Sequence, residues 1–489
     1  MTEHLGFIDC SLRDGQQSNW ATRMTNAMVL PELERLDIMG FDSIDLIGGA
    51  VFDVCVRFLQ EDPYERMRIA ARRAPRTPLN VWLRGQSLYT FELYPDDIVE
   101  LNARRIAANG IRRLTVYDAL NDIRNIELTL RVAREVGLHA SAQVVYTVSP
   151  AHTDDYYTDL ARKIAALGTA DTIGLKDPSG LLTPERIRTL VPAIKAAIGS
   201  VPLELHTHCR SGLGEEVVME SVPLGVTVLH TGIYPLGGGD ANPDMRHCAR
   251  QLKAAGYRVE PRDEDLAEME RRFVAMAKIH NKPLPSRNRY DPYLYYHQVP
   301  GGMISNLRSQ LHGMGIEHRL QEVLEEAGRV RQDLGYPILV SPFAQFVITQ
   351  ATLNVLQGER YATIPDEVAR YTLGFYGRAA APIDEAVMDR VTEFTGIKDR
   401  NDLRPGSLIE PRVEKLQRTR GPFESDEDLL LAAFYQPSQL KPLFAMRGRG
   451  ATTPLAKSSL RQIICAAQQL PRGGRTRVKR PGYELEGRR

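Results

Sequence analysis

Hydrophobic and polar positions alternate in two periods along the first half of the chain. From residue 5 to about residue 235, short apolar runs of the kind that form buried strands alternate with amphipathic segments of helical period. The predicted strands are 5–10, 43–47, 79–83, 113–117, 140–146, 172–175, 203–206 and 226–230. The clearest intervening helices are 23–39, 95–109, 123–136 and 183–197. Eight strands joined by helices must pair in parallel, and the count predicts an α/β fold, a (β/α)8 TIM barrel.

The alternation stops after the glycines at 237–239, and a different pattern follows. Residues 258 to about 440 are mainly helical in pattern, as in 264–280, 320–334 and 343–356. From Arg447 onward the chain is rich in Gly, Arg and Lys, and Glu484 and Glu486 are its only acidic residues there. The sequence therefore predicts a barrel over 1–257, a helical domain over 258–445, and a basic, disordered tail over 446–489.

Composition narrows the protein class. The 489 residues are 43% hydrophobic and 25% charged, with a formal net charge of +1, which is typical of a globular protein and gives no reason to expect nucleic acid as a partner. We find no secretory signal after Met1 and no run of 18 apolar residues to span a membrane. Five scattered cysteines without CxxC pairs fit a reducing compartment. We expect a cytoplasmic protein.

Candidate chemistry lies at three predicted strand ends, which is where barrel enzymes carry their active sites. Asp14 follows the first strand, Lys176 and Asp177 end the sixth, and His206 and His208 end the seventh. Residues two apart on a strand point to the same face, so His206 and His208 both project toward the barrel mouth. Two imidazoles with a carboxylate suit a divalent transition metal such as zinc, manganese or cobalt.

Lys176 is the unusual member of this group, because an ammonium repels a metal cation. Burial beside a metal favours the neutral amine, which can add carbon dioxide and become a carbamate with anionic oxygen ligands. The residues alone equally allow an ion pair between Lys176 and Asp177, and the choice stays open here.

Nine stretches, in order from residue 7 to about 435, resemble one known family. They include CSLRDGQQSNWATR at 10–23, LRGQ at 83–86, LKDPSGLLT at 175–183, ELHTHCRSG at 204–212, QVPGGMISNLRSQ at 298–310 and ILVSPFAQ at 338–345. The resemblance is to the carboxyltransferase family of biotin-dependent enzymes, which includes the pyruvate carboxylase carboxyltransferase domain, the transcarboxylase central subunit and the oxaloacetate decarboxylase alpha subunit. It implies carboxyl transfer between carboxybiotin and a 2-oxo acid such as pyruvate or oxaloacetate.

The resemblance also implies site residues. A divalent metal (Zn, Mn or Co) is expected on Asp14, carbamylated Lys176, His206 and His208. Arg13, Gln17 and Arg84 are expected to hold the 2-oxo acid, since a planar guanidinium grips a carboxylate with two bonds.

The hydroxyl of Ser341, in Val340–Ser341–Pro342, is expected to move a proton between substrate and biotin, which makes Ser341, Lys176 and Arg84 the catalytic set. Asp53, with Ser341, is expected in the biotin pocket.

This chain departs from the family pattern at several of these places. Ser341 replaces a threonine, Gly15–Gln16 replaces Ala–His, and Phe91 replaces a tyrosine. Arg210 replaces a small residue beside the histidines, and the 232–240 segment is also different.

Partners follow from the motifs. The chain has no Ala–Met–Lys–Met biotinylation motif and no ATP-grasp region. We therefore expect biotin on a separate carrier protein, a biotin carboxylase in trans and, by analogy with the family, a homodimer. Two other functions stay open: a metal-dependent acyl-CoA aldol or Claisen enzyme like isopropylmalate synthase or hydroxymethylglutaryl-CoA lyase, and a non-catalytic assembly subunit.

Overall fold

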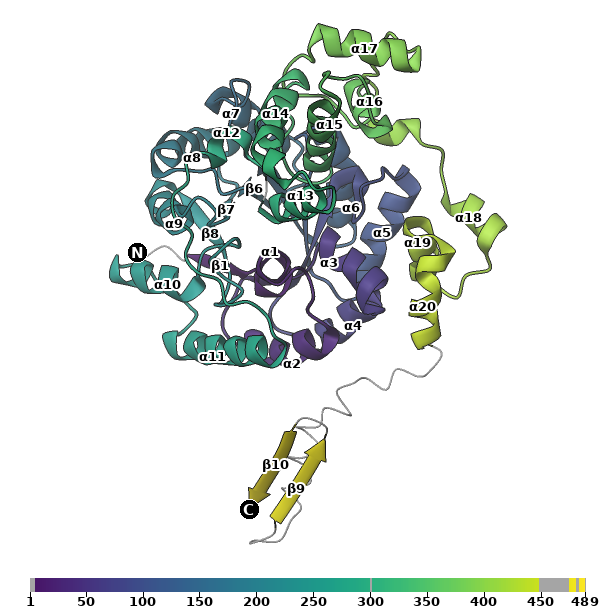
Figure 1. The fold of residues 1–489 in the computed structure, drawn as a ribbon. Helices are drawn as coiled ribbons and strands as arrows, with labels where there is room; N and C mark the ends of the chain where they lie inside the picture. Colours follow the sequence, from purple (N-terminus) through teal and green to yellow (C-terminus); the bar gives the residue numbers. More distant parts are fainter. Residues whose placement is uncertain (1–4, 300, 448–474, 481–482, 489) are drawn as a thin grey trace.

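Eight parallel strands close into a barrel in the computed structural model, which describes residues 5–299, 301–447, 475–480 and 483–488 (Figure 1). Each strand pairs with its neighbours in chain order, and β1 and β8 pair with each other to close the barrel. The strands are β1 Gly6–Asp9, β2 Ser43–Ile47, β3 Leu79–Arg84, β4 Arg113–Tyr117, β5 His139–Val145, β6 Thr172–Asp177, β7 Leu203–Thr207 and β8 Val226–Thr231. The predicted (β/α)8 barrel is confirmed, with strand ends within two residues of the predicted ones.

The helices of the first half surround the strands or follow their carboxyl ends. They are α1 Gln16–Asn19, α2 Asn26–Leu36, α3 Gly49–Val54, α4 Pro63–Arg73, α5 Asp96–Ala108, α6 Glu127–Glu135, α7 Asp154–Ala166, α8 Pro184–Ile198, α9 Gly214–Ser221 and α10 Met245–Ala254. α8 illustrates why they form. The Thr183 hydroxyl accepts from the Arg186 N–H at the first turn, Pro184 takes the first helical position, and an apolar face from Ile187 to Ile198 is buried.

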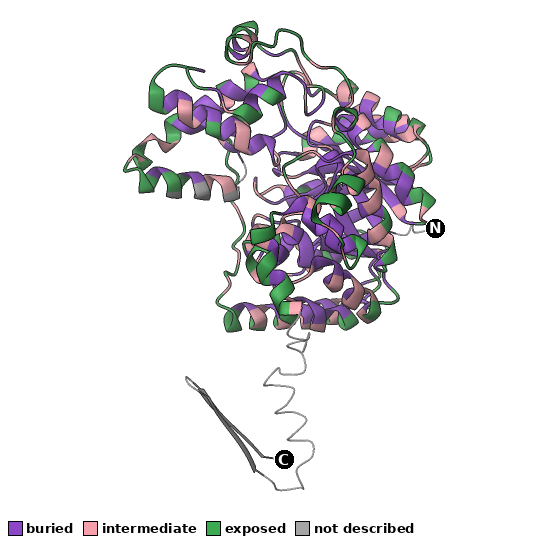
Figure 2. Cartoon of the chain, turned by 90° about the vertical axis from the view of Figure 1, so that its right-hand side faces the viewer, coloured by how far each residue is buried: buried purple, intermediate pink, exposed green. Residues whose placement is uncertain are grey.

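The chain continues as a predominantly helical segment. Its helices are α11 Asp263–Ile279, α12 Leu294–His297, α13 Gly301–Gly313, α14 Leu320–Asp333, α15 Phe343–Gln357, α16 Asp366–Thr372, α17 Glu385–Thr395, α18 Val413–Arg420, α19 Asp426–Phe434 and α20 Pro437–Arg447. Figure 2 shows from the side that α13–α17 stand at one end of the barrel, while buried residues concentrate within the barrel.

Packing divides this helical segment. Apolar residues of α13–α17 form one cluster with Ala119 and Leu120 from the barrel. In contrast, α11 contributes Leu266 and Phe273 to the barrel core, and α19 returns to that same core through Leu430. The chain therefore leaves the barrel to build a helical cap and then comes back to it. The domain boundaries at 257 and 445 stay a prediction.

The basic tail is described only in part. Arg475–Arg480 and Tyr483–Arg488 pair as two antiparallel strands, β9 and β10. The prediction of a disordered tail otherwise concerns residues 448–474, 481–482 and 489, which lie outside the described residues. Among the helices that the structure describes, none has the length and apolarity needed to cross a membrane.

The inside of the barrel is strongly polar. Fully buried charged and polar side chains project inward from several strands, and they pair with each other across the barrel. They include Asp45, Asn80, Arg113, Thr115, Ser141, Gln143, Glu204, His206 and His230. Charges without water must be paired or hydrogen-bonded, so this interior fixes the orientation of the residues that reach the barrel mouth.

Candidate active site

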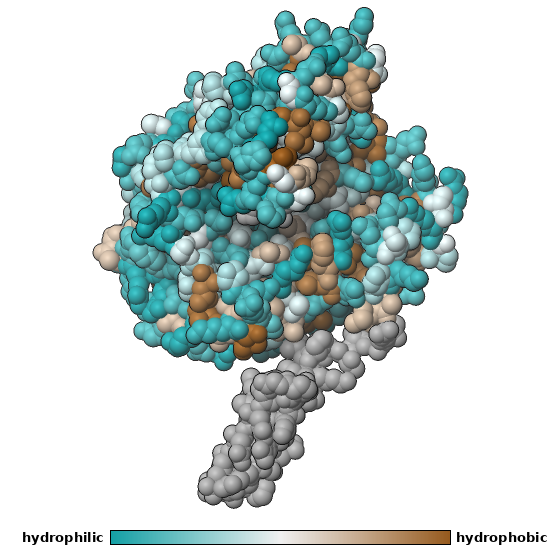
Figure 3. Space-filling view, in the orientation of Figure 1, coloured by the Kyte–Doolittle hydropathy of each residue, from teal (hydrophilic) through white to brown (hydrophobic). Residues whose placement is uncertain are grey.

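A cavity of about 700 Å³ lies at the carboxyl ends of the strands, under the helical cap. Figure 3 shows this face as mostly hydrophilic, with apolar residues gathered around a central hollow. Eight of the nine residues predicted for the site line the cavity: Arg13, Asp14, Gln17, Asp53, Arg84, Lys176, His208 and Ser341. The ninth, His206, lies directly behind them and is fully buried. The structure thus brings together residues that are more than 300 positions apart.

Asp14 is the centre of the metal-type cluster. It lies in η1 Ser11–Gly15, a π-helical turn that continues directly from β1, and it is 2% exposed rather than part of an open loop. One of its oxygens, Oδ2, lies 3.2 Å from His206 Nε2 and 3.3 Å from His208 Nε2. The ligand atoms of these three residues all lie within 4.8 Å of one another. Two imidazole nitrogens and a carboxylate oxygen that converge in this way fit a divalent transition metal.

The charge states in the cluster suit metal ligands. Burial alone raises the pKa of Asp14, but the Arg13 charge and hydrogen bonds to His206 and His208 hold it well below its usual value. Burial, together with the charge of Lys176, keeps the pKa of His206 well below its usual value. An ionised carboxylate and a neutral imidazole are the forms that bind metal.

Lys176 lies beside His206 in the barrel wall, because β6 and β7 pair these two residues in register. Its ammonium nitrogen lies 4.8 Å from the centre of the Trp82 ring and 5.4 Å from that of Tyr117. Burial lowers the pKa of Lys176 to about 8, although Asp14 opposes this shift. A substantial share of the amine is therefore neutral near neutral pH, which is the form that reacts with carbon dioxide.

The ion pair between Lys176 and Asp177 that the sequence left open is not formed. Asp177 points to the other side of β6, where it accepts from the N–H groups of Leu181 and Leu182 at 2.9 and 2.8 Å and from the Thr207 hydroxyl at 3.0 Å. It anchors the loop after β6 and leaves Lys176 directed at the cavity.

Trp82 and Asp45 were not predicted, and both position the site. Asp45 Oδ2 accepts from Arg13 Nη2 at 3.1 Å and from Trp82 Nε1 at 2.7 Å, while the Arg13 guanidinium stacks 4.3 Å from the Trp82 ring centre. Arg13 Nη1 also lies 2.9 Å from Asp14 Oδ2. A carboxylate inside the otherwise apolar strand Ser43–Ile47 was the signal in the sequence that this residue has a buried cationic partner.

Arg84 is held at the cavity by backbone oxygens. Its Nη1 and Nη2 donate to the carbonyls of Thr90 and Tyr89 at 2.7 and 3.0 Å, and its guanidinium lies 5.1 Å from the ring centre of Phe91. Within the described part of the chain it has no carboxylate partner within 4 Å. Arg84 is thus a preorganised cation that is available to an anionic ligand.

The helical parts of the chain supply the remaining wall. Ser341 comes from the turn before α15, and Phe434, Tyr435, Gln436 and Gln439 come from the end of α19 and the beginning of α20. Asp53 lies opposite, 3.5 Å from Arg57, and burial raises its pKa. The C-terminal wall was missed by sequence reasoning because no motif marks it.

The departures from the family pattern have local structural reasons. Gly15 lies against the 232–240 segment, where an added Cβ would lie 2.4 Å from the Leu236 carbonyl oxygen. Gln16 is buried and bridges the Leu12 carbonyl and the Met24 N–H. Asp240, from the altered segment, offers its carbonyl oxygen to His208 Nδ1 at 2.8 Å. These substitutions therefore support the metal-type cluster from outside.

Arg210 adds a further cation to the cavity wall. Its Nη1 donates to the Val299 carbonyl at 3.1 Å, and its Nε lies 3.8 Å from the half-exposed Asp240 carboxylate. The side chain thereby links the loop after β7 to the chain just before α13.

Comparisons with known proteins agree with this geometry. The family described as "Conserved carboxylase domain" matches residues 294–462. A pyruvate carboxylase subunit of Methanocaldococcus jannaschii is 40% identical over 92% of this chain and 79% of its own length. The methylmalonyl-CoA carboxyltransferase 5S subunit of Propionibacterium freudenreichii subsp. shermanii is 35% identical over 90% of this chain and 87% of its own.

A solved structure has the same fold over most of the chain. The carboxyl transferase domain of Rhizobium etli pyruvate carboxylase, solved with oxamate and biotin, is 26% identical with a TM-score of 0.82 and covers 91% of this chain and 78% of that one. Fold, site residues and sequence identity lead to one conclusion: this chain belongs to the carboxyltransferase family of biotin-dependent enzymes, and it is a carboxyltransferase of the type that forms a separate subunit of archaeal pyruvate carboxylase.

Proposed function

We propose that this protein transfers a carboxyl group between carboxybiotin, carried on another protein, and a small 2-oxo acid such as pyruvate or oxaloacetate. The observation that carries the proposal is the convergence of Arg84, Lys176, His208 and Ser341 on one cavity, with Asp14 at its base. Small anionic substrates are bound in such cavities by a few convergent polar groups.

Asp14, His206 and His208 would hold a divalent metal, with Lys176 as a fourth ligand in its carbamylated form. The convergence of the first three ligand atoms supports this assignment, and so does the lowered pKa of the Lys176 amine. Zinc, manganese and cobalt are all compatible with this donor set. When bound, the metal supplies a Lewis acid that stabilises the negative charge of an enolate.

The substrate would be held by cations. Arg84 has its guanidinium fixed by two carbonyls and free of a carboxylate partner among the described residues, which suits it to the carboxylate of a 2-oxo acid. Arg13 is already paired with Asp14 and Asp45, so we assign it to orient the keto oxygen through its remaining donors. Gln17 is an exposed amide on the same wall.

Ser341 would move the proton. In the carboxylating direction, the substrate methyl gives a proton through the Ser341 hydroxyl to biotin N1 as the carboxyl group leaves that nitrogen and joins the substrate carbon. In the reverse direction, the same hydroxyl returns a proton to the enolate carbon. Asp53 and Phe91 lie on the wall where the biotin ring would enter.

We also propose the partners. Both relatives named above are described as subunits, which supports a separate biotin carrier and a biotin carboxylase in trans. A homodimer is proposed by analogy with the family, and sedimentation of the purified protein tests it.

The deciding experiment is decarboxylation of oxaloacetate by the purified protein, followed as pyruvate release, with and without free biotin and before and after removal of metal. We expect release that requires both biotin and metal. Ser341→Ala should lower the rate by about 10²- to 10⁴-fold, the usual contribution of a positioned proton carrier, while Ser341→Thr keeps activity.

Controls make the test specific to the substrate. A panel of 2-oxo acids of different length and charge addresses Arg210, whose guanidinium lines the same cavity. Turnover of an acyl-CoA thioester without biotin would contradict the proposal and favour the aldol or Claisen function. Metal-loaded protein that binds a carrier but turns over no 2-oxo acid would favour the assembly subunit.

A further inference from the structure

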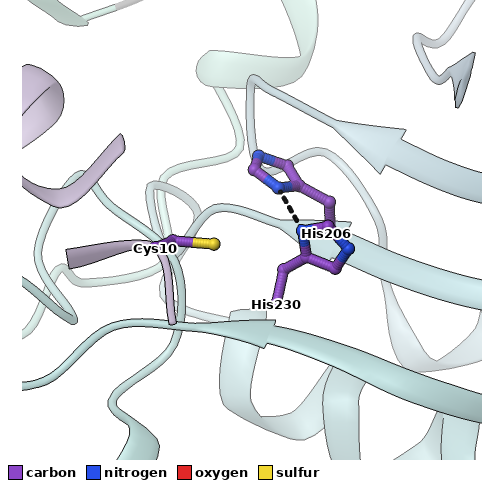
Figure 4. A group of neighbouring side chains, drawn as sticks. All are labelled: Cys10, His206 and His230. Carbon is purple, nitrogen blue, oxygen red and sulfur yellow. Dashed lines mark hydrogen bonds between the residues drawn. The ribbon is translucent and has the colours of Figure 1, made fainter. Parts of the chain in front are cut away.

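A second histidine lies behind the metal-type cluster, in the closed interior of the barrel. His230, on β8, faces the inner side of His206, and their Nδ1 atoms lie 3.2 Å apart, as Figure 4 shows. The other nitrogen of His230, Nε2, lies 3.1 Å from Glu204 Oε2. Glu204, His206 and His230 are all 0% exposed. The three side chains therefore form one buried row that ends at the cluster.

The far end of the row is fixed by charge. Glu204 pairs with Arg113, and it also accepts from the Ser141 hydroxyl at 3.0 Å. An ionised carboxylate can only accept hydrogen bonds, so His230 must carry a proton on Nε2. A neutral His230 then has a bare Nδ1, which accepts the proton that His206 carries on its own Nδ1.

This order leaves a lone pair on His206 Nε2, the atom that lies 3.2 Å from Asp14 Oδ2. That tautomer is the one a metal ligand requires. Histidines that bind metals commonly donate their other nitrogen to a hydrogen-bond acceptor, which fixes both tautomer and ring orientation. Here the acceptor is a histidine that is itself oriented by a carboxylate.

We propose that His230 and Glu204 are positioning residues for the metal site, and that they act by fixing His206 in the tautomer that presents Nε2 to the metal. The inference rests on the proposed metal site and deepens it. It adds to that site two residues of the closed barrel interior that do not line the cavity.

A competing interpretation of the same atoms is a second metal ion. Cys10 Sγ lies in the same group, and its ligand atom and those of His206 and His230 are within 4.8 Å of one another (Figure 4). The Cys10 thiol is instead directed at the Ile8 carbonyl oxygen, 3.8 Å away, and His230 already has Glu204 on its other side. Hydrogen bonds account for the polar atoms of this group without an ion.

The test measures metal binding separately from catalysis. The full-length apo chain is titrated with zinc against a chromophoric chelator, and cobalt is bound to record its visible d–d absorption, which reports ligand geometry. His230→Phe removes the acceptor at similar volume, and Glu204→Gln weakens the hold on His230. Ser141→Ala is the matched control, because it removes another hydrogen bond to Glu204 without touching His230.

We expect His230→Phe to weaken zinc binding by about 10- to 100-fold and to change the cobalt spectrum, as second-sphere substitutions do in other metal sites. Glu204→Gln should give a smaller change in the same direction, while Ser141→Ala and Cys10→Ala should retain wild-type affinity and one ion per chain.

Unchanged zinc affinity in both His230→Phe and Glu204→Gln overturns the proposal, and one folded variant suffices to decide it. Two ions per chain, one of them lost in Cys10→Ala, also overturns it in favour of the second ion. A wild-type chain that binds no zinc overturns the inference as well. In contrast, a chain that binds zinc with the expected pattern but transfers no carboxyl group leaves this inference standing while the proposed function fails.

Discussion

At the scale of the residue, Gly15 shows how tightly the neighbours of the metal-type cluster are packed. It directly follows Asp14, and an added Cβ would lie 2.4 Å from a backbone oxygen and 2.9 Å from the Leu236 side chain. A backbone atom cannot move aside as the end of a side chain can. We expect Gly15→Ala to lower the free energy of unfolding by about 1–3 kcal/mol, as overpacking does, and to displace Asp14.

Chemical denaturation and metal content measure these two effects. Gly313→Ala is the control, because a Cβ there meets open space, and its effect should stay within about 0.5 kcal/mol. A Gly15→Ala protein with wild-type stability and metal content would show that the 232–240 segment yields easily.

Lys176 carries a second prediction at this scale. Replacement by alanine should abolish oxaloacetate decarboxylation and weaken metal retention, because the carbamate oxygens are lost. Lys176→Arg keeps a cation beside Trp82 but cannot form a carbamate, and it should behave like the alanine variant. Metal content after dialysis and pyruvate release are the measurements; a fully active, metal-replete Lys176→Ala protein excludes the assigned role.

The residue scale also separates what the sequence could and could not predict. Asp14, Lys176, His206 and His208 follow or end predicted strands, and parallel strands in a barrel bring their carboxyl ends together. Arg84 and Ser341 were identified only through motifs shared with a family. Hydrogen-bond partners such as His230 and Glu204 depend on which residues face each other across the barrel, and periodicity does not specify that pairing.

At the scale of the element, helix α19 joins the end of the described helical segment to the barrel through a buried carboxylate. Glu427, whose side chain is 5% exposed, accepts from Arg105 Nη2 at 2.7 Å and from Asn109 Nδ2 at 2.8 Å, both on or beside α5. Burial raises the pKa of Glu427, but these two partners outweigh it, and the net pKa is lowered. The ionised form therefore holds α19 in place.

We expect Glu427→Gln to cost about 1–3 kcal/mol of unfolding free energy at pH 7, since Arg105 is one-third exposed and water partly replaces the lost charge. A carboxylate with a lowered pKa in the folded state contributes its stability above the pKa of the unfolded chain and loses it as pH falls through the folded value. The difference between wild type and variant should thus shrink below about pH 4.5, the ordinary glutamate range.

Denaturation at pH 7 and near pH 4 measures this difference. Glu100→Gln, on the exposed side of α5 in a pair with Arg104, is the control and should change stability by at most about 0.5 kcal/mol. A difference that grows toward acid pH contradicts the assigned charge state.

Element order was largely predictable from the sequence, and its path in space was not. Hydrophobic period located the eight strands and helices such as α14 and α15. The return of α19 and α20 to the barrel was missed, because an amphipathic helix shows that one face is buried without showing against what.

At the scale of the whole molecule, the proposed function makes this chain one part of a larger reaction. We expect the purified protein alone to incorporate no labelled bicarbonate into a 2-oxo acid with ATP. Addition of a biotinylated carrier and a biotin carboxylase should start incorporation. A carrier without biotin is the control, and incorporation by the isolated chain would contradict the proposed division of labour.

The cavity joins the two ends of the described barrel and cap. Its wall includes Arg13 and Asp14 near the beginning of the chain and Phe434 to Gln439 near the end of the helical segment. A ribosome adds about 5–20 residues per second, so about 20–90 s of synthesis separate these walls. During translation, the metal-type cluster can fold while its cavity still lacks one side. The catalytic compartment is therefore among the last parts of the protein to be completed, and a chain cut short before α19 exposes a polar, metal-binding barrel mouth to the cell without the wall that encloses it.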